Sequence, residues 1–359
     1  MSSLFDPVTF PHGGQMTNRF MLAPLTNQQS HPDGTLSGQE HDWLVMRAKG
    51  GFGAVMTAAA FVQPDGKGFD GQLGIHDDVC NPGLERLARS IKANGSLALV
   101  QLYHCGRRGM AKLTGKPLVA PSDDQETGAR AMTVAEIEAM IENFIAAAQR
   151  AQRTGFDGAE IHGAHGYLLC AFLSPTFNRR TDEYGGSLGN RTRPLRAVVD
   201  GIRDRCGPEF NLGLRLSPER VHVEMAEMLD FTGELLAQGK LDFLDMSLWD
   251  VFKEPEDAAF KGKSLMDCFS ELERGKTRLG AAGNIRSARD AEACLAAGVD
   301  FVAIGRAAIA AHDFPRRVRD EEAYTMPALP LSPDHLEAEG VSPPFMEYLR
   351  TFDRFVAGE

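Results

Sequence analysis

The chain has 359 residues, 43% of them hydrophobic, and a formal net charge of −11 at pH 7. A chain of this length and composition can bury one large core or two modest ones, and its acidic balance argues against nucleic acid or an anionic membrane as a partner. No apolar run approaches the ~20 residues that span a bilayer, and the first residues lack the basic and apolar regions of a signal peptide, so we expect a cytoplasmic protein.

Eight short apolar runs alternate with helical patterns along the chain. Several runs are almost wholly apolar, which is typical of strands that are covered on both faces in a parallel sheet. The predicted strands span residues 19–24, 53–60, 97–102, 157–162, 211–216, 242–247, 277–282 and 300–305.

Four of the intervening segments carry signals for the start of a helix. Asn81 and Ser217 are each followed by a proline, which suits an N-cap residue and the first helical position. Thr133 has a glutamate three residues later, the pattern of a capping box, and apolar residues then recur at helical spacing. Ser287 opens a further helix, which is expected to stop at Gly298.

The ordered strand–helix units predict an α/β fold of the (β/α)8 TIM-barrel class. We expect a single domain over residues 1–359, with a proline-rich C-terminal tail from about residue 325 that packs across the barrel or reaches a neighbouring subunit. The alternative is a doubly wound open sheet, which the lack of a G-x-G-x-x-G sequence near an early strand disfavours. Residues 103–132 and 163–187 form long loops after the third and fourth strands, on the side where barrel enzymes build their sites.

The six cysteines form no C-x-x-C pair, so the sequence predicts neither a zinc site nor an iron–sulfur cluster, and no metal is expected. Scattered thiols fit a reducing compartment. Cys105 and Cys170 fall within the two long loops and are the ones closest to the expected site.

The stretch that begins at His162 places two imidazoles and a phenol within six residues, directly after the fourth predicted strand. His162 and His165 can donate hydrogen bonds to a carbonyl or nitro oxygen, and Tyr167 can supply a proton beside it. The alternative is that both histidines are structural, but the sequence around them favours a catalytic role.

The last two strand–helix junctions suit a phosphate group. Gly283 and Asn284 follow the seventh strand, and Gly305 and Arg306 follow the eighth. Glycine lets backbone N–H groups approach a phosphate, a helix start adds a favourable dipole, and an arginine can add a two-pronged contact. Tight turns and a surface arginine are the alternative for either junction, but the two together favour phosphate.

Three positions suit the ring of a flavin. The Gln101 amide, at the end of the third strand, can both donate and accept hydrogen bonds, as a pyrimidine edge demands. Arg215 projects from the fifth strand in an apolar context, where the anionic edge of a reduced flavin or a neighbouring carboxylate would give the cation a partner. Thr26 follows the first strand, and its hydroxyl either contacts the flavin O4 or is an ordinary loop residue.

Residues 18–26, 101–107 and above all 162–191 resemble the old yellow enzyme family of FMN-dependent ene-reductases, and the resemblance extends over nearly the whole chain. It implies that His162 and His165 bind the substrate oxygen and that Tyr167 is the proton donor. Tyr103 and Trp249 are candidates for the substrate pocket, although many relatives carry tryptophan or alanine in place of Tyr103. The resemblance further implies FMN-ring contacts by Pro24, Leu25, Thr26, Ala59, Gln101 and Arg215, and phosphate contacts by Gly283, Asn284, Gly305 and Arg306.

The function implied by this resemblance is transfer of hydride from NADPH or NADH, through FMN, to the β-carbon of small-molecule activated alkenes. The chain would act as a monomer or a homo-oligomer such as a dimer, and Arg350 would lie at the surface or reach a partner's site. Two alternatives stay open: a non-redox barrel lyase or aldolase acting on a phosphorylated substrate, and a flavin-binding protein without turnover.

Overall fold

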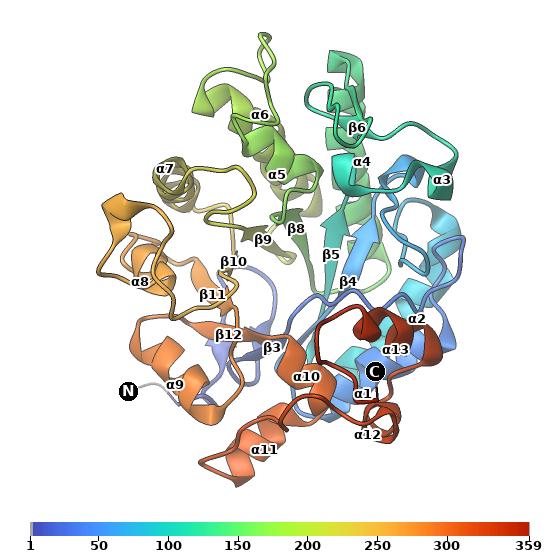
Figure 1. Ribbon diagram of the computed structural model, residues 1–359, viewed down its shortest axis with the longest axis vertical. Helices are drawn as coiled ribbons and strands as arrows, with labels where there is room; N and C mark the ends of the chain where they lie inside the picture. Colours follow the sequence, from blue (N-terminus) through green and yellow to red (C-terminus); the bar gives the residue numbers. More distant parts are fainter. Residues whose placement is uncertain (1–2, 359) are drawn as a thin grey trace.

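Figure 1 shows a computed structural model of the chain, in which residues 3–358 are described. Within that range eight parallel strands close into a barrel, with helices around it, which confirms the predicted TIM barrel. Each predicted strand segment contains most or all of one barrel strand. In spatial order the strands are β3 (Phe20–Leu22), β4 (Ala54–Phe61), β5 (Leu97–Tyr103), β8 (Gly158–Gly163), β9 (Asn211–Leu216), β10 (Phe243–Ser247), β11 (Arg278–Ala282) and β12 (Phe301–Ile304).

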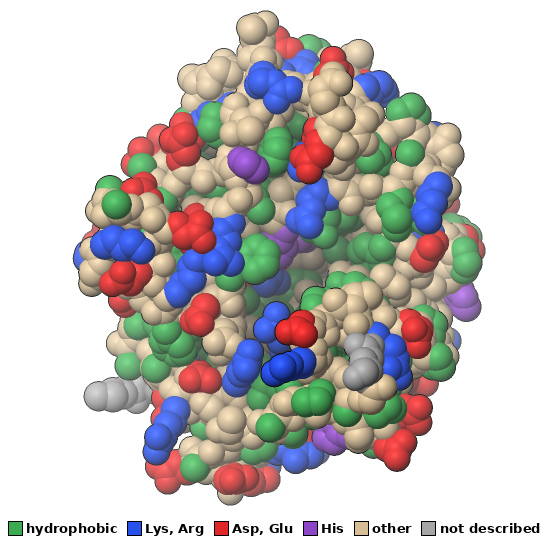
Figure 2. Space-filling view, in the orientation of Figure 1, with side chains coloured by type: hydrophobic (Ala, Val, Ile, Leu, Met, Phe, Trp, Pro, Cys, Tyr) green, Lys and Arg blue, Asp and Glu red, His purple; other side chains and the backbone are tan. Residues whose placement is uncertain are grey.

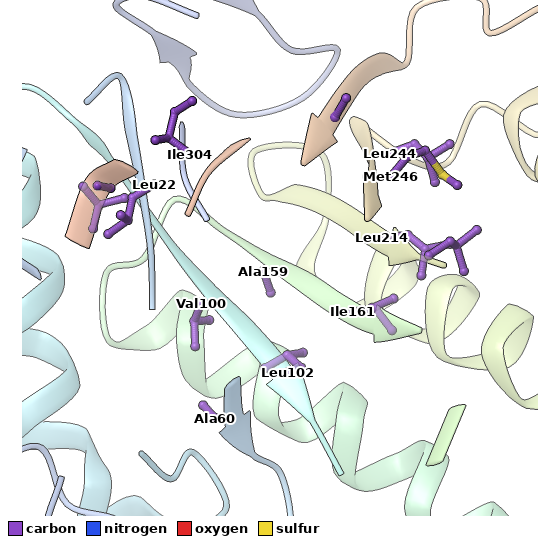
Figure 3. Close-up of a cluster of buried hydrophobic side chains, with 14 of the residues drawn as sticks. Leu22, Ala60, Val100, Leu102, Ala159, Ile161, Leu214, Leu244, Met246 and Ile304 are labelled. Carbon is purple, nitrogen blue, oxygen red and sulfur yellow. The ribbon is translucent and has the colours of Figure 1, made fainter. Parts of the chain in front are cut away.

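The main hydrophobic core lies between the barrel and the surrounding helices. Outward-facing strand residues such as Val100, Ile161 and Leu214 are fully buried there, as Figure 3 shows, and they belong to one cluster with helix residues such as Phe144. The described α-helices are α1 (Gly38–Lys49), α2 (Asn81–Lys92), α3 (Ala111–Thr114), α4 (Val134–Arg153), α5 (Leu168–Leu173), α6 (Leu188–Cys206), α7 (Met225–Ala237), α8 (Leu265–Ser270), α9 (Ala288–Ala296), α10 (Arg306–Ala310), α11 (Phe314–Asp320), α12 (Pro333–Ala338) and α13 (Pro343–Arg350). Short 3-10 turns are η1 (Pro64–Gly66), η2 (Asp78–Cys80), η3 (Gly106–Arg108) and η4 (Ala258–Phe260).

The structure confirms two of the helix starts and corrects two. Thr133 and Ser287 each form a capping box, at α4 and α9. Asn81 is the first residue of α2 and not its cap, because η2 runs directly into this helix. Ser217 begins no helix, and α7 starts only at Met225. The loop between them includes residues with positive φ (220 and 222, at 74° and 56°), a backbone conformation that a right-handed helix excludes.

The interior of the barrel is filled at its amino end and open at its carboxyl end. The short hairpin of β1 (Val8–Thr9) and β2 (Gln15–Met16) belongs to an apolar cluster with inward-facing residues of the strands. Large rings fit there because their neighbours lack side chains: a Cβ on Gly213 would lie 2.0 Å from the Phe243 ring. The space left for a ligand is therefore at the carboxyl ends of the strands, where barrel enzymes place their sites.

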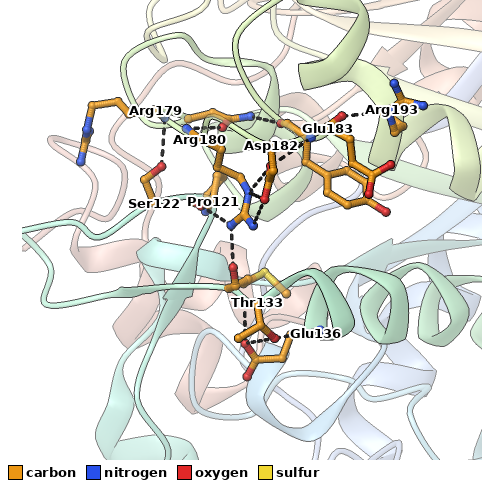
Figure 4. A network of polar contacts seen from close by, with 12 residues as sticks. Pro121, Ser122, Thr133, Glu136, Arg179, Arg180, Asp182, Glu183 and Arg193 are labelled. Atoms are coloured by element: carbon orange, nitrogen blue, oxygen red, sulfur yellow. Dashed lines mark hydrogen bonds and ion pairs between the residues drawn. The ribbon is translucent and has the colours of Figure 1, made fainter.

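The two long loops are joined to each other beside that opening. The loop after β5 includes β6 (Val119–Ala120) and β7 (Arg130–Ala131), which pair in parallel. Arg180, in the loop after β8, donates from Nη1 to the carbonyl oxygens of Pro121 and Met132 at 2.8 and 2.5 Å, and from Nε to Asp182 at 3.0 Å (Figure 4). These bonds hold the loops in a fixed arrangement on one side of the barrel mouth.

The C-terminal segment packs on the barrel of its own chain. Trp43 of α1 meets Phe345 of α13 edge-on, with ring centroids 5.5 Å apart, and α13 lies in front of α1 in Figure 1. Apolar residues of α12 and α13 are buried in the main core. Among the helices of residues 3–358, none is long and apolar enough to cross a membrane.

Candidate active site

One cavity, with a volume of about 130 Å³, opens at the carboxyl end of the barrel. Figure 2 shows a hollow near the centre of this face, with histidine visible inside it. Side chains alternate along each strand, so the inward-facing residues at the strand ends converge on one space. Phe69, which sequence analysis missed, lines the cavity together with nine of the predicted site residues: Pro24, Thr26, Ala59, Gln101, Tyr103, His162, His165, Tyr167 and Arg215.

The two histidines lie side by side in one wall of the cavity. The Nδ1 atom of His165 is 3.3 Å from Nε2 of His162, and its Nε2 is 2.7 Å from the Ser247 hydroxyl. His162 Nδ1 accepts the backbone N–H of Ala164 at 3.2 Å, so a neutral His162 carries its hydrogen on Nε2, the atom nearer His165. His165 has a positive φ of 62°, an uncommon backbone conformation for a residue other than glycine.

Both imidazoles are neutral near pH 7. Burial, followed by the charges of His165 and Arg215, holds the pKa of His162 well below its ordinary value of 6.5. Burial, followed by the charges of Arg215 and Arg108, lowers the pKa of His165 to about 3. Each ring can therefore donate one N–H without carrying a charge.

Tyr167 stands beside the histidines, at the residue before α5. Its ring centroid is 5.0 Å from that of His162 and 4.6 Å from that of Tyr103, both in edge-on geometry. The Arg108 guanidinium lies 5.0 Å from the centre of the Tyr167 ring. Burial, and then the neighbouring Tyr167, raises the pKa of Tyr103 well above 10, so its hydroxyl stays protonated. The cavity thus holds two neutral N–H donors and two phenols in contact.

The floor of the cavity is polar on the side of β5, β8, β9 and β10. Gln101 Nε2 donates to Glu160 Oε1 at 2.7 Å, and Arg215 Nη1 lies 3.3 Å from Asp245 Oδ2. The neighbouring carboxylate that the sequence left open as a partner for Arg215 is therefore Asp245. Burial, and then the charge of Asp245, raises the pKa of Glu160 to about 8, and burial also raises the pKa of Asp245.

Sequence analysis missed both of these carboxyl groups. Each sits at an inward-facing position of an otherwise apolar strand, two residues before a residue of the wall: Glu160 before His162, and Asp245 before Ser247. An acidic residue at such a position was the signal that could have identified them, because a buried carboxyl needs a nearby partner.

The residues of the floor fit the ring of a flavin. Pro24 and Ala59 offer apolar surface, while Gln101 and Arg215 offer hydrogen bonds along one edge. The buried Nε of Arg215 finds no hydrogen-bond partner among residues 3–358. A buried N–H without an acceptor is costly, and an oxygen or nitrogen at the edge of a bound ring would satisfy it.

The predicted phosphate residues lie at the ends of β11 and β12, which are neighbours in the barrel. Gly283 has a φ of 149°, and a Cβ there would come within 2.8 Å of the Trp249 backbone. Asn284 has a φ of 56° and donates its side-chain N–H to Asp250 at 3.0 Å. Its amide is therefore engaged, so a ligand would meet its backbone. The second junction is Gly305, which precedes α10, with Arg306 exposed as the first residue of that helix and Leu25 next to Gly305.

Two further aromatic residues, Trp249 and Tyr348, contact residues of the cavity but do not line it. Trp249 is 46% exposed and has a positive φ of 63°, with its ring 5.9 Å from His165 and the Arg220 guanidinium 5.6 Å from its centre. Tyr348 of α13 lies close enough to Thr26 and Tyr167 for both to affect its pKa, which burial raises. Sequence analysis missed Tyr348, because nothing in the order of residues places α13 beside the first strand.

A larger groove lies away from these groups, between α9 and α11 and the start of the chain. Its arginines serve the fold: Arg19 Nη1 donates to the carbonyl oxygen of Asp300 at 2.6 Å, and Arg278 Nε donates to that of Thr9 at 2.9 Å. Size alone therefore does not identify the site.

The fold is a closed parallel barrel, and its cavity has an unsatisfied N–H of Arg215 on the floor and two neutral imidazoles in the wall. These features fit a barrel flavoenzyme of the oxidoreductase class. Residues 3–324 match the NADH:flavin oxidoreductase / NADH oxidase family, and the chain belongs to that family. Membership confirms the old yellow enzyme resemblance, the FMN cofactor and a nicotinamide reductant, and it is incompatible with a non-redox lyase.

Individual relatives agree with this assignment. The chain is 41% identical over 314 residues to the probable NADH-dependent flavin oxidoreductase YqiG of Bacillus subtilis, with 84% of each protein covered. It is 35% identical over 326 residues to the NADH:acrylate oxidoreductase of Vibrio harveyi, where the match covers 85% of this chain but only 32% of that protein. The X-ray structure of the old yellow enzyme homologue from Zymomonas mobilis has a TM-score of 0.81 at 27% identity, over 93% of this chain and 96% of that one.

Proposed function

We propose that the chain is an ene-reductase that uses NADH or NADPH to reduce the C=C bond of α,β-unsaturated carbonyl or nitro compounds. The observation that carries this proposal is the set of two neutral histidines and a phenol, gathered in one cavity over the Arg215 floor. Bound FMN supplies the chemistry of accepting hydride at N5 and passing it to the β-carbon of the alkene.

The residues of the wall would polarise the substrate. His162 and His165 donate their N–H groups to its carbonyl or nitro oxygen, which stabilises the negative charge that develops there in the transition state. Tyr167 gives a proton to the α-carbon. Tyr103 and Trp249 shape the space in which the alkene lies.

The floor and the two glycine junctions would hold the cofactor. Gln101 and Arg215 orient the polar edge of the ring, and Arg215 favours the reduced state because it faces the negative charge of that edge. Pro24, Leu25, Thr26 and Ala59 would lie against the ring, while Gly283, Asn284, Gly305 and Arg306 would hold the phosphate.

The Vibrio relative, an NADH:acrylate oxidoreductase, supports an activated alkene as the substrate class, because acrylate carries a C=C bond conjugated to a carboxylate. Reductant and alkene would occupy the same space above the ring in turn. Double-reciprocal plots of initial rate against NADPH concentration, at several fixed alkene concentrations, should therefore give parallel lines. Intersecting lines would contradict a shared site.

An anaerobic titration tests the proposal. Purified protein loaded with FMN should bleach on addition of NADH or NADPH and regain its flavin absorbance when cyclohexenone is added without oxygen. Bleaching without recovery across a panel of enones and nitroalkenes would overturn the alkene as substrate. Absence of bleaching would instead indicate a flavin-binding protein without turnover.

We also propose that residues 1–359 form one FMN-binding domain. Its location in the cytoplasm and its assembly as a monomer or a homo-oligomer stay predictions. Light scattering of the protein as it leaves a size-exclusion column measures the oligomeric state directly.

A further inference from the structure

Two carboxyl groups lie beneath the cavity without the hydrogen-bond donors that they need. Glu160 of β8 and Asp245 of β10 are both fully buried. Gln101 satisfies one oxygen of Glu160, but Oε2 of Glu160 and both carboxyl oxygens of Asp245 accept no hydrogen bond within residues 3–358. The strands of the two residues, β8 and β10, border β9 on its two sides, and the charge and hydrogen-bonding capacity of Asp245 act on the pKa of Glu160. A proton between them would supply the missing donor, because a protonated carboxyl carries one O–H.

The charges around this pair favour one proton. Arg215 of β9 is the single cation that contacts it among the described residues, through Asp245 at 3.3 Å. The other groups around this cluster are neutral. Gln101 of β5 contacts Glu160, Ser247 of β10 contacts Arg215, and His162 of β8 is uncharged because burial and the charges of His165 and Arg215 lower its pKa. The rest of the barrel interior includes an apolar cluster with Met21, Ala23, Met56, Ala282 and Ala303. Two ionised carboxyls with one guanidinium would leave a net negative charge in an apolar interior, whereas one shared proton makes the cluster neutral.

We propose that Glu160 and Asp245 share a single proton beneath Arg215, and that loss of this proton in alkaline solution makes the bound cofactor harder to reduce. The inference rests on the proposed position of the flavin edge over Arg215. With the proton present, the pair carries one negative charge, which neutralises the positive charge of Arg215. Without it, the cluster is negative and opposes the negative charge that reduction adds above it.

The proton balance follows from linkage. Reduction delivers two electrons from NAD(P)H to the cofactor and places a negative charge near Arg215, which raises the affinity of the pair for its proton. At a pH where the pair is ionised above an oxidised cofactor, reduction therefore draws one proton from water onto the carboxyl pair. The pair gains a proton and no electrons, so each two-electron reduction in this pH range takes up one more proton than at lower pH.

The midpoint potential of bound FMN as a function of pH measures this extra proton. For the wild type we expect the potential to fall more steeply above about pH 8, by a further ~30 mV per pH unit, since a tenfold change in a two-electron equilibrium corresponds to that potential. Glu160→Gln keeps an acceptor for Gln101 and offers N–H groups to Asp245 but cannot ionise, so the steeper region should disappear. Asp245→Asn should remove it as well.

A matched control is Glu40→Gln. Glu40 is also fully buried, burial raises its pKa to about 7, and it bonds to Ser30 and Asn27 on the outer side of the barrel. This variant should keep the wild-type pH dependence. A steeper region that persists in Glu160→Gln, or that is also lost in Glu40→Gln, would overturn the proposal.

Infrared spectra of the FMN-free protein test the shared proton without the cofactor. The spectra are compared in the Glu40→Gln background, because Glu40 is a second buried carboxyl with a raised pKa. In that background a carboxylic-acid carbonyl band should be present at pH 7, decrease as the pH rises past about 8, and be missing once Glu160→Gln is added. Lack of such a band would refute the shared proton even if the variants fail to bind FMN. Failure of the ene-reductase proposal gives a different result, in which enones do not reoxidise the enzyme while the potential keeps its pH dependence.

Discussion

Removal of the two imidazoles should slow reoxidation of the reduced enzyme by the alkene and leave its reduction by NADPH nearly unchanged. We expect His162→Ala and His165→Ala each to slow reoxidation of the reduced protein by cyclohexenone, because each loses an N–H donor that faces developing negative charge. Loss of one such donor costs about 2.7–4 kcal/mol elsewhere, which corresponds to roughly 100- to 1000-fold in rate. Burial keeps both rings neutral, so no full charge is lost and the effect should stay within this range.

The reductions in reoxidation rate caused by the two single substitutions should not multiply in the double variant. Nδ1 of His165 is only 3.3 Å from Nε2 of His162, so each ring orients the other and removal of one already disturbs its partner. Neighbouring residues of this kind couple energetically. The double variant should therefore be slower than either single variant but faster than the product of the two effects.

Stopped-flow absorbance of the flavin measures each half-reaction separately. Reduction by NADPH should change by only a few-fold in these variants, since the histidines act on the alkene oxygen. The control is His41→Ala, which alters a histidine on α1 that contacts Asp42 and Ser90. If the double variant is reoxidised at the wild-type rate, the assignment of the histidines to the substrate oxygen is wrong.

Four further predictions use the same protein. Tyr167→Phe should leave reduction by NADPH intact and slow single-turnover reduction of an enone, and an unchanged rate would show that solvent supplies the proton. Trp43→Ala removes a fully buried ring between α1 and α13 and should lower the free energy of unfolding in urea by about 3–5 kcal/mol, whereas Val79→Ala, at an exposed position, should change it little. Because burial lowers the pKa of His165 to about 3, reoxidation should show no transition near pH 6.5. The free energy of unfolding should fall as the pH drops below 6.5, since the unfolded chain then binds protons that the folded histidines exclude.

The sequence predicted the barrel because its signals are local. Each strand is a short apolar run, and each capping box, as at Thr133 and Ser287, lies within four residues of chain. The helix expected at Ser217 failed for the opposite reason. Its hydroxyl accepts the backbone N–H of His165 at 3.0 Å, a contact across 52 residues that competes with local capping.

By itself, the order of residues determined the eight strand–helix units, the side of the barrel that carries the site, and the chemical types gathered there, because period-two alternation fixes which side chains point inward. Only the tertiary structure decided which of them meet: Asp245 beneath Arg215, Glu160 beside Asp245, Tyr348 near Thr26. Closure of the barrel joins β12 to β3 and pairs Val302 with Phe20, two residues from opposite ends of the chain. The electrostatic state of a buried group depends on those distant neighbours, and no local pattern encodes them.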